Sequence, residues 1–182
     1  VPPCRGREGP VQGSISHLMQ PDQFWTISPS AGLRGEPTRF LSTFDPVASP
    51  SQAVAGMSAL TPAEVLAQYL TNLAAFEAVV VSIQPEQWET VLAEAPPGHL
   101  TLSATALHAL WDSWIHERDV VIPLGLTPVE VPDELEAILR YVVGLSPAFA
   151  SSAGFEKSGT LGIVATDPSL SLIVHAADTV RV

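Results

Sequence analysis

The chain has 182 residues, of which 46% are hydrophobic, and this much apolar material excludes a disordered chain and favours one main folded domain. Eight Lys and Arg residues against 19 Asp and Glu residues give a net charge of −11, which excludes nucleic acid as an expected partner because such a surface repels phosphates. Cys4 is the only cysteine, so no intrachain disulfide can form and a reducing, cytoplasmic setting is expected.

The start of the chain, Val1-Pro2-Pro3, has neither an initiator Met nor a signal-peptide pattern, so we expect a chain shortened at its N-terminus. Charged and proline residues such as Glu77 and Pro85 interrupt the longest apolar runs before the roughly 20 residues that a bilayer span requires. We therefore expect no membrane helix.

Residues 1–60 are rich in Pro, Gly and Ser, a composition typical of turns and loops. One short helix is expected within this stretch. Ser14 would cap it, His17 would lie within it, and Pro21 would end it, because proline cannot continue the backbone hydrogen-bond ladder.

A long helix is predicted to begin at Thr61-Pro62-Ala63-Glu64, which combines a Thr cap, a proline in the first turn and the Glu of a capping box. Apolar residues follow at three- and four-residue steps, and we expect them to form one stripe that faces a core and packs on the helix of residues 102–121. The members of this stripe are Val65, Leu66, Tyr69, Leu70, Leu73, Phe76 and Val80.

Two more helices are predicted further along the chain. One runs from about Leu102 to Val121, after the breaker at residues 96–98 and before Pro123. The other begins near residues 132–134 and is expected to end at Gly144 and Pro147.

From Gly159 onward the sequence favours two short strands, Leu161 to Ala165 and Leu170 to Val174, joined by a turn at Asp167-Pro168-Ser169. Two strands alone do not form a stable domain. We therefore expect the beginning of a second, truncated domain over residues 155–182.

The helix of residues 102–121 carries the residues that suggest chemistry. At about 100° per residue, five polar side chains fall within an arc of roughly 80°, and Asp112 and His116, four residues apart, can hold one metal ion together. An ordinary amphipathic helix with this arc in solvent is the alternative, but Ser113, Glu117 and Arg118 offer a second candidate for the wet side. The five polar residues of the arc are Thr105, His108, Asp112, His116 and Asp119.

Zinc-class metal sites use three or four protein ligands, so the pair needs a partner from another segment. His17, on the predicted early helix, is the natural candidate for this third ligand. We interpret His99, His175 and Cys4 as incidental, because they stand beside a turn, in a late strand and after two prolines.

The segment Ala106 to Asp119, followed by Pro123-Leu124-Gly125, resembles the metal-site helix of the mycothiol-dependent maleylpyruvate isomerase N-terminal family, which belongs to the DinB/YfiT-like group of metal-binding four-helix bundles. The family pattern of an acidic residue, a histidine four positions later and a nearby Asp matches Asp112, His116 and Asp119, although Glu is usual at the position of Asp112. The start of the chain, with His17-Leu18, is similar to the family segment that supplies the first metal ligand, and the last thirty residues resemble the first strands of its C-terminal domain.

The resemblance implies a mainly α fold, an up-and-down DinB-like bundle over residues 1–150 that lacks its first helix, with a short truncated β appendage. It implies a divalent metal, Zn²⁺, held by His17, Asp112 and His116, and mycothiol as thiol cosubstrate for isomerisation or thiol transfer on a small organic substrate. Asp119 would orient a ligand histidine, and His108 would be an extra ligand, an acid-base group or a structural residue. Two alternatives remain open: a non-catalytic metal-binding or regulatory module, and an inactive gene fragment.

Overall fold

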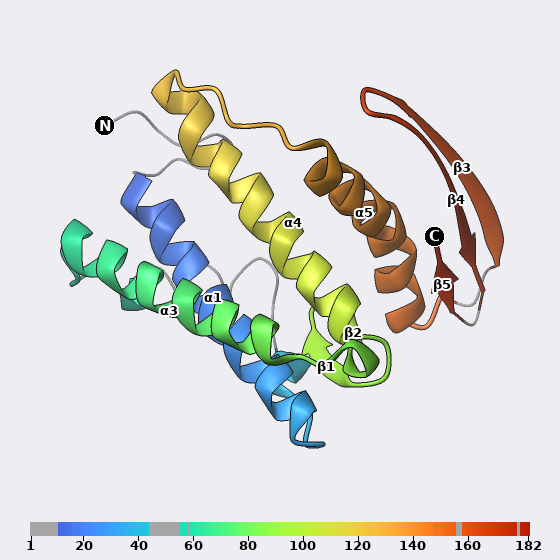
Figure 1. Ribbon diagram of the computed structural model, residues 1–182, viewed down its shortest axis with the longest axis horizontal. Coiled ribbons are helices and arrows are strands. Elements are labelled where there is room, and N and C mark those ends of the chain that lie inside the picture. The colour runs from blue at the N-terminus through green and yellow to red at the C-terminus, as the bar shows by residue number, and fades with distance from the viewer. Residues whose placement is uncertain (1–10, 44–54, 58, 156–157, 178) are drawn as a thin grey trace. The chain divides into compact units, whose positions relative to one another are not determined.

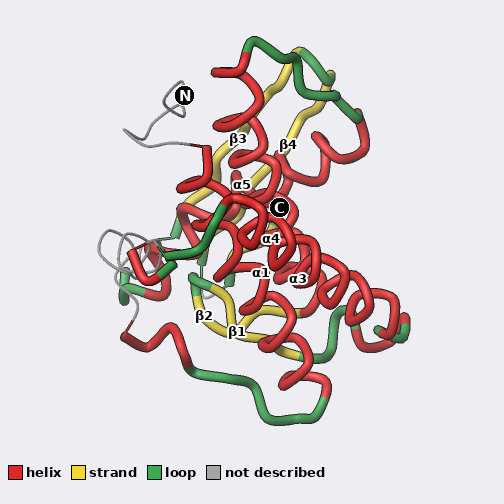
Figure 2. The backbone as a smooth tube through the Cα atoms, turned by 90° about the vertical axis from the view of Figure 1, so that its left-hand side faces the viewer, coloured by secondary structure: helices red, strands yellow, loops and turns green. Residues whose placement is uncertain are grey.

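The computed structural model describes residues 11–43, 55–57, 59–155, 158–177 and 179–182, without the side chains of residues 11–14, 17–22, 43 and 152 (Figure 1). The fold is mainly helical with a small C-terminal antiparallel sheet, which confirms the expected class (Figure 2). The helices are α1 (Val11–Leu33), α3 (Pro62–Ser82), α4 (Leu102–Val121) and α5 (Pro132–Ser152), with short 3₁₀ turns at Phe40–Thr43, Pro85–Gln87 and Ile122–Leu124. The strands are β1 (Leu92–Ala95), β2 (Gly98–Thr101), β3 (Gly159–Thr166), β4 (Ser169–Ala176) and β5 (Val180–Arg181).

The chain divides into two compact units. The first comprises residues 1–95 and 99–128, and the second comprises residues 96–98 and 129–182. Helix α5 thus groups with the C-terminal strands, whereas a domain boundary between residues 150 and 155, as the family resemblance implies, stays a prediction.

Helix α1 is the central element of the first unit, since α3, α4 and β1 all pack against it. The expectation that this helix ends at Pro21 is wrong, because it continues through Pro21 and Pro29 to Leu33. Each proline removes one backbone donor, but the helix buries Trp25 and Ala31 in return. Near its end, a Cβ at Gly32 would overlap the carbonyl oxygen of Leu92, so the close approach of α1 to β1 requires glycine here.

The start of α3 agrees with the prediction. The backbone N–H of Glu64 donates to Thr61 Oγ1 at 3.3 Å, the N–H of Thr61 donates to Glu64 Oε2 at 2.8 Å, and Pro62 occupies the first turn. These bonds satisfy two of the amide donors that a helix N-terminus leaves without internal partners.

The expected core stripe of α3 is only partly correct. Val65 is buried and Phe76 packs against the cluster of Trp25, Ala95 and Ala109, but three leucines of the same stripe are exposed. The main neighbour of α3 is α1 rather than α4, and one neighbour covers one flank of a helix that is apolar over a wider arc. The exposed leucines are Leu66, Leu70 and Leu73.

Helix α3 also bears on the expectation that no helix spans a membrane. Among the described residues it is the one helix that is long and apolar enough to do so, by length and composition alone, and few of its residues are buried. The helix nonetheless packs on α1, and Val65 within it is buried. The spacing and charge of the residues that α3 exposes, rather than its length and composition, therefore distinguish a membrane neighbour from a protein neighbour.

A β-hairpin, formed by β1 and β2, leads into α4, an element that sequence periodicity did not indicate. Glu94 of β1 is buried, and its carboxylate accepts hydrogen bonds from Thr38 Oγ1 at 2.7 Å and from the N–H groups of Phe40 and Leu41 at 2.8 Å each. Thr101 Oγ1 then caps α4 by accepting from the N–H of Ala104 at 3.3 Å. The hairpin thus holds the 38–41 segment and sets the starting point of α4.

The second unit consists of α5 and a sheet with the strand order β3-β4-β5. Strands β3 and β4 pair antiparallel in the register Gly159↔Ala176 to Thr166↔Ser169, which confirms the predicted hairpin. The prediction that α5 ends at Gly144 and Pro147 is wrong, because the helix continues to Ser152. A Cβ at Gly144 would lie 3.1 Å from Val182, so this glycine faces the end of the chain closely instead of ending the helix.

Candidate functional site

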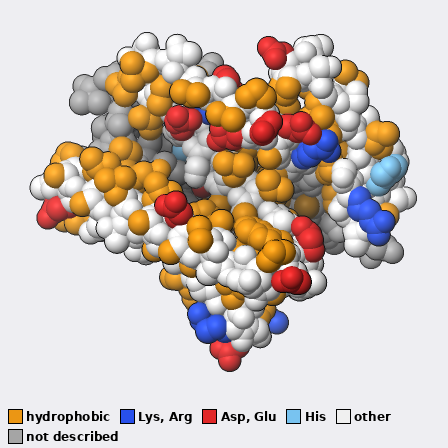
Figure 3. Space-filling view, viewed as in Figure 1, with side chains coloured by type: hydrophobic (Ala, Val, Ile, Leu, Met, Phe, Trp, Pro, Cys, Tyr) orange, Lys and Arg blue, Asp and Glu red, His pale blue; other side chains and the backbone are white. Residues whose placement is uncertain are grey.

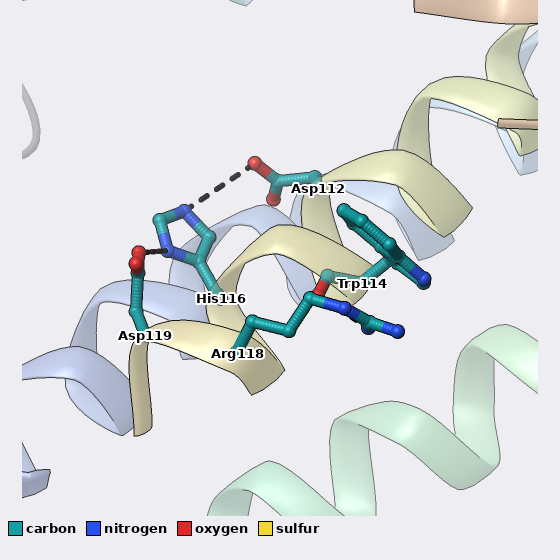
Figure 4. Close-up of polar contacts among 5 residues, drawn as sticks. All are labelled: Asp112, Trp114, His116, Arg118 and Asp119. Carbon is teal, nitrogen blue, oxygen red and sulfur yellow. Dashed lines mark hydrogen bonds and ion pairs between the residues drawn. The ribbon is translucent and has the colours of Figure 1, made fainter. Parts of the chain in front are cut away.

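Helix α4 presents one histidine between two carboxylates (Figure 4). His116 Nδ1 lies 3.2 Å from Asp119 Oδ2, and His116 Nε2 lies 3.6 Å from Asp112 Oδ1. The three side chains are half-buried, with 14% of His116, 18% of Asp112 and 27% of Asp119 exposed. The spacing of three and four residues puts them on one face of the helix, as the sequence predicted.

The two carboxylates face different nitrogen atoms of the His116 ring: Asp119 lies beside Nδ1, and Asp112 lies beside Nε2. A neutral ring that donates Nδ1–H to Asp119 turns the lone pair of Nε2 toward Asp112, where two electron-rich atoms repel each other. A positive charge between Nε2 and Asp112 removes this conflict, either as a proton on the ring or as a metal cation. The arrangement is therefore chemically suited to hold a cation.

The distance between the two facing atoms is consistent with a shared ion. Two ligand atoms that each lie 2.0–2.2 Å from a tetrahedral Zn²⁺ are separated by roughly 3.3–3.6 Å. The observed distance of 3.6 Å between His116 Nε2 and Asp112 Oδ1 lies at the upper end of that range. The donor set of one nitrogen and one oxygen also suits zinc.

His17 lies in α1, but its side chain is outside the described part of the structure. Its backbone position can be placed relative to α4. The two helices run antiparallel, and the rings of Trp25 and His108 are in contact between them, with centroids 5.0 Å apart (Figure 1). Eight residues before Trp25 is His17, and eight residues after His108 is His116, so both steps lead about 12 Å in the same direction. The backbone of residue 17 therefore lies near the level of His116.

Among the described side chains, no group of three or more His, Cys, Asp and Glu residues is arranged to hold a metal ion. The predicted set of His17, Asp112 and His116 includes a side chain outside that description, so it stays a prediction. The pair from α4 is the part of the site whose geometry is visible.

His108, the candidate for an extra ligand or acid-base group, is a core residue. It is 4% exposed and packs against Trp25 and, edge-on at 5.4 Å, against Trp111. Burial lowers its pKa from 6.5 to about 4, so the ring is neutral at pH 7. One turn earlier on the same helix, Thr105 Oγ1 is buried without a hydrogen-bond partner among the described residues.

The polar residues outside this face divide in an unexpected way. Ser113 and Glu117 are exposed, as a solvent-facing side requires, but Arg118 is 9% exposed. Its guanidinium lies 3.5 Å from the ring centre of Trp114 (Figure 4). Its Nη1 donates to the Trp114 carbonyl and to Glu117, each at 3.1 Å. The i,i+4 spacing of Trp and Arg was the sequence signal for this stacked pair.

The two other described histidines, interpreted from the sequence as incidental, make hydrogen bonds to residues distant in the sequence. His99 Nε2 lies 2.8 Å from the carbonyl oxygen of Thr38, and His175 Nδ1 lies 3.1 Å from Thr160 Oγ1. Cys4 falls outside the described residues. The sequence pattern did not indicate the buried carboxylate of Glu94. This carboxylate accepts three hydrogen bonds from the 38–41 segment.

Comparisons with protein-family models, with curated proteins and with solved structures find no match to this chain. The geometry of α4 is therefore the main support for any functional assignment.

Proposed function

We propose that this chain is a divalent-metal protein in which Asp112 and His116 of α4, together with His17 of α1, hold a Zn²⁺-class ion. We further propose that it acts on a small organic substrate with a small thiol, by isomerisation or thiol transfer. The observation that carries the proposal is the placement of His116 Nε2 opposite Asp112 while Nδ1 is held by Asp119. The DinB-like bundle type and mycothiol as the thiol rest on the family resemblance and belong to the same proposal.

The protein's own residues have distinct roles in this proposal. Asp119 accepts a hydrogen bond from Nδ1–H of His116 and so favours the tautomer in which Nε2 would be the ligand atom. Asp112 supplies the negative charge that pairs with a cation, and its half-buried position strengthens that attraction relative to bulk water. When bound, a zinc ion lowers the pKa of a coordinated thiol, so that a thiolate is present near neutral pH.

The hydrophobic surroundings contribute to the same site. His108, which is buried, and Trp111, which is half-buried, occupy the preceding turn of α4 and pack edge-on against each other. A dry neighbourhood favours binding of a small organic substrate next to a charged centre. In this proposal His108 contributes through packing, because it is buried against Trp25 and Trp111.

Metal titration tests the proposal directly. Isothermal titration of purified protein with Zn²⁺ at about pH 7.5 is expected to show one equivalent bound, with weaker binding near pH 5.5, because protons compete for the histidines. His116→Ala should nearly abolish binding, and Asp119→Asn should weaken it by about 10- to 100-fold through loss of ring orientation. His99→Ala, which changes an exposed histidine elsewhere, is the matched control and should bind normally.

Two results separate the parts of the proposal. Equal zinc binding by the parent and by His116→Ala would remove the metal assignment. Normal binding by His17→Ala would remove only the third ligand. If zinc binds as expected, a screen for thiol-dependent turnover on activated double bonds distinguishes the enzyme from a non-catalytic metal-binding module.

A further inference from the structure

Helix α3 exposes a row of large apolar side chains on the surface of the first unit. We name this row the α3 stripe, and its members, with their exposed fractions, are Leu66 (49%), Leu70 (53%), Leu73 (43%) and Val81 (78%). Figure 3 shows hydrophobic side chains gathered over α3. Contiguous apolar surface of this kind marks an interaction site in a soluble protein.

The α3 stripe is a different flank from the one that packs on α1. At 100° per residue, the stripe is centred roughly 100° around the helix from Val65, Tyr69 and Phe76, which are among the buried and half-buried residues of α3. Helix α1 therefore cannot cover both flanks. A helix that is apolar on two flanks is typical of an element with a second helical neighbour.

The spacing and charge of the stripe specify that neighbour. Leu66, Leu70, Leu73 and position 77 follow the four-three-four spacing of a coiled-coil seam, which accommodates the side chains of another helix. Between residues 62 and 82 the charged residues are Glu64 and Glu77, with no Lys or Arg. Helices that lie on membranes carry Lys and Arg beside their apolar face, and a chain of net charge −11 is repelled by anionic lipid, so a protein helix fits better than a membrane.

The charge of Glu77 favours one of the two possible orientations, parallel or antiparallel, of two paired copies of α3. Two copies of α3 packed in parallel would place Glu77 against Glu77. In an antiparallel pair centred on Leu70, Glu77 lies level with Ala63 of the second copy, in the first turn of its helix, where the positive end of the helix dipole attracts a carboxylate. Glu64 of the same turn lies roughly 140° around the helix from the stripe, so it faces away from the pair. The two Glu77 side chains are then separated by about 21 Å along the axis, well beyond the Debye length of about 8 Å at physiological salt.

We propose that the α3 stripe is a homodimer interface, in which two copies of α3 pack antiparallel about a two-fold axis at Leu70. The same stripe serves both partners, as an isologous interface requires. This inference does not depend on the metal site. A helix of 21 residues is about 30 Å long, so the interface is at the small end for stable complexes and a dissociation constant in the micromolar range is expected.

Sedimentation-velocity measurements over protein concentrations up to about 200 µM, which cover micromolar dissociation constants, test the proposal. The parent chain should show a monomer–dimer equilibrium. Leu70→Glu and Leu70→Lys should each weaken self-association by about tenfold or more, because each puts like charges together at the axis. An equal mixture of the two variants should associate again, since Glu then faces Lys. Gln68→Glu, on the opposite flank, is the control and should dimerise like the parent.

Other outcomes overturn the proposal. A parent chain that stays monomeric throughout the concentration range refutes it, as does a mixture of the two charged variants that fails to associate while both keep the parent's circular dichroism spectrum. Flotation of a monomeric parent with phosphatidylcholine vesicles, lost in Leu70→Glu, would assign the stripe to a membrane instead. Self-association that Leu70→Glu leaves unchanged would place the dimer interface elsewhere.

Discussion

The buried histidine of α4 makes the stability of this protein depend on pH in a calculable way. In the folded chain burial lowers the pKa of His108 from 6.5 to about 4. Between these values the unfolded chain binds a proton that the folded chain does not, so unfolding becomes easier as the pH falls. The contribution of neutral, buried His108 to the free energy of unfolding is therefore fully present above pH 6.5 and is lost as the pH falls toward 4.

The magnitude follows from the two pKa values. A difference of 2.5 between 6.5 and about 4 corresponds to a limit of about 3 kcal/mol, and at pH 5 the loss is already about 2 kcal/mol. Urea denaturation of the parent and of His108→Phe at a series of pH values, from 7.5 down to about 4.5, measures this term as the difference between the two curves. Subtraction removes the contribution of carboxylates, which titrate in both proteins.

One outcome of these urea measurements would contradict the prediction. If the free energy of unfolding of His108→Phe falls with pH as steeply as that of the parent, His108 is not the group whose desolvation controls the acid limb. His99→Ala, which changes an exposed histidine, should retain the full pH dependence and serves as the control.

Three further stability predictions follow from buried groups. Glu94→Ala should destabilise by about 2–4 kcal/mol in urea denaturation, because three donors lose a charged acceptor, whereas Glu89→Ala at an exposed position should change stability by less than about 0.5 kcal/mol. Thr105→Val should be neutral or stabilising by up to about 1 kcal/mol, since the hydroxyl has no partner among the described residues, and a clear loss of thermal stability would indicate a bound water. Leu102→Ala, at a residue 1% exposed, should lower the free energy of unfolding by about 2–5 kcal/mol, and an effect no larger than that of Leu126→Ala, at a residue 60% exposed, would contradict the core assignment.

Local signals predicted the start of α3 and the β3–β4 hairpin well, but they did not indicate the β1–β2 hairpin, and α1 begins at Val11 rather than after a cap at Ser14. The capping box at Thr61 and Glu64 forms as expected, because its bonds involve residues three apart and need no tertiary partner. The turn at Asp167-Pro168 and the alternating strands around it are also local features, and β3 and β4 pair there. The side-by-side placement of Asp112 and His116 follows from helix geometry alone.

Helix ends were less predictable where proline was the signal. Pro21 and Pro147 were expected to end helices, yet α1 and α5 continue to Leu33 and Ser152. A proline in a helix costs about 3 kcal/mol locally, which packing along the rest of the helix can offset. Trp25 illustrates that packing, because it lies beyond Pro21 and is 4% exposed in the cluster with Ala95 and Ala109.

The sequence by itself determined which faces exist, and only the tertiary structure decided which of them are covered. Periodicity identified the apolar residues of α3, but the position of α1 decided that Val65 is buried while Leu70 stays exposed. Spacing put His108, Asp112 and His116 on one face of α4, yet only packing against Trp25 of α1 showed that His108 is a core residue with a lowered pKa. The physical reason is that periodicity depends on the geometry of a single helix, whereas burial and pKa depend on neighbours that are distant in sequence.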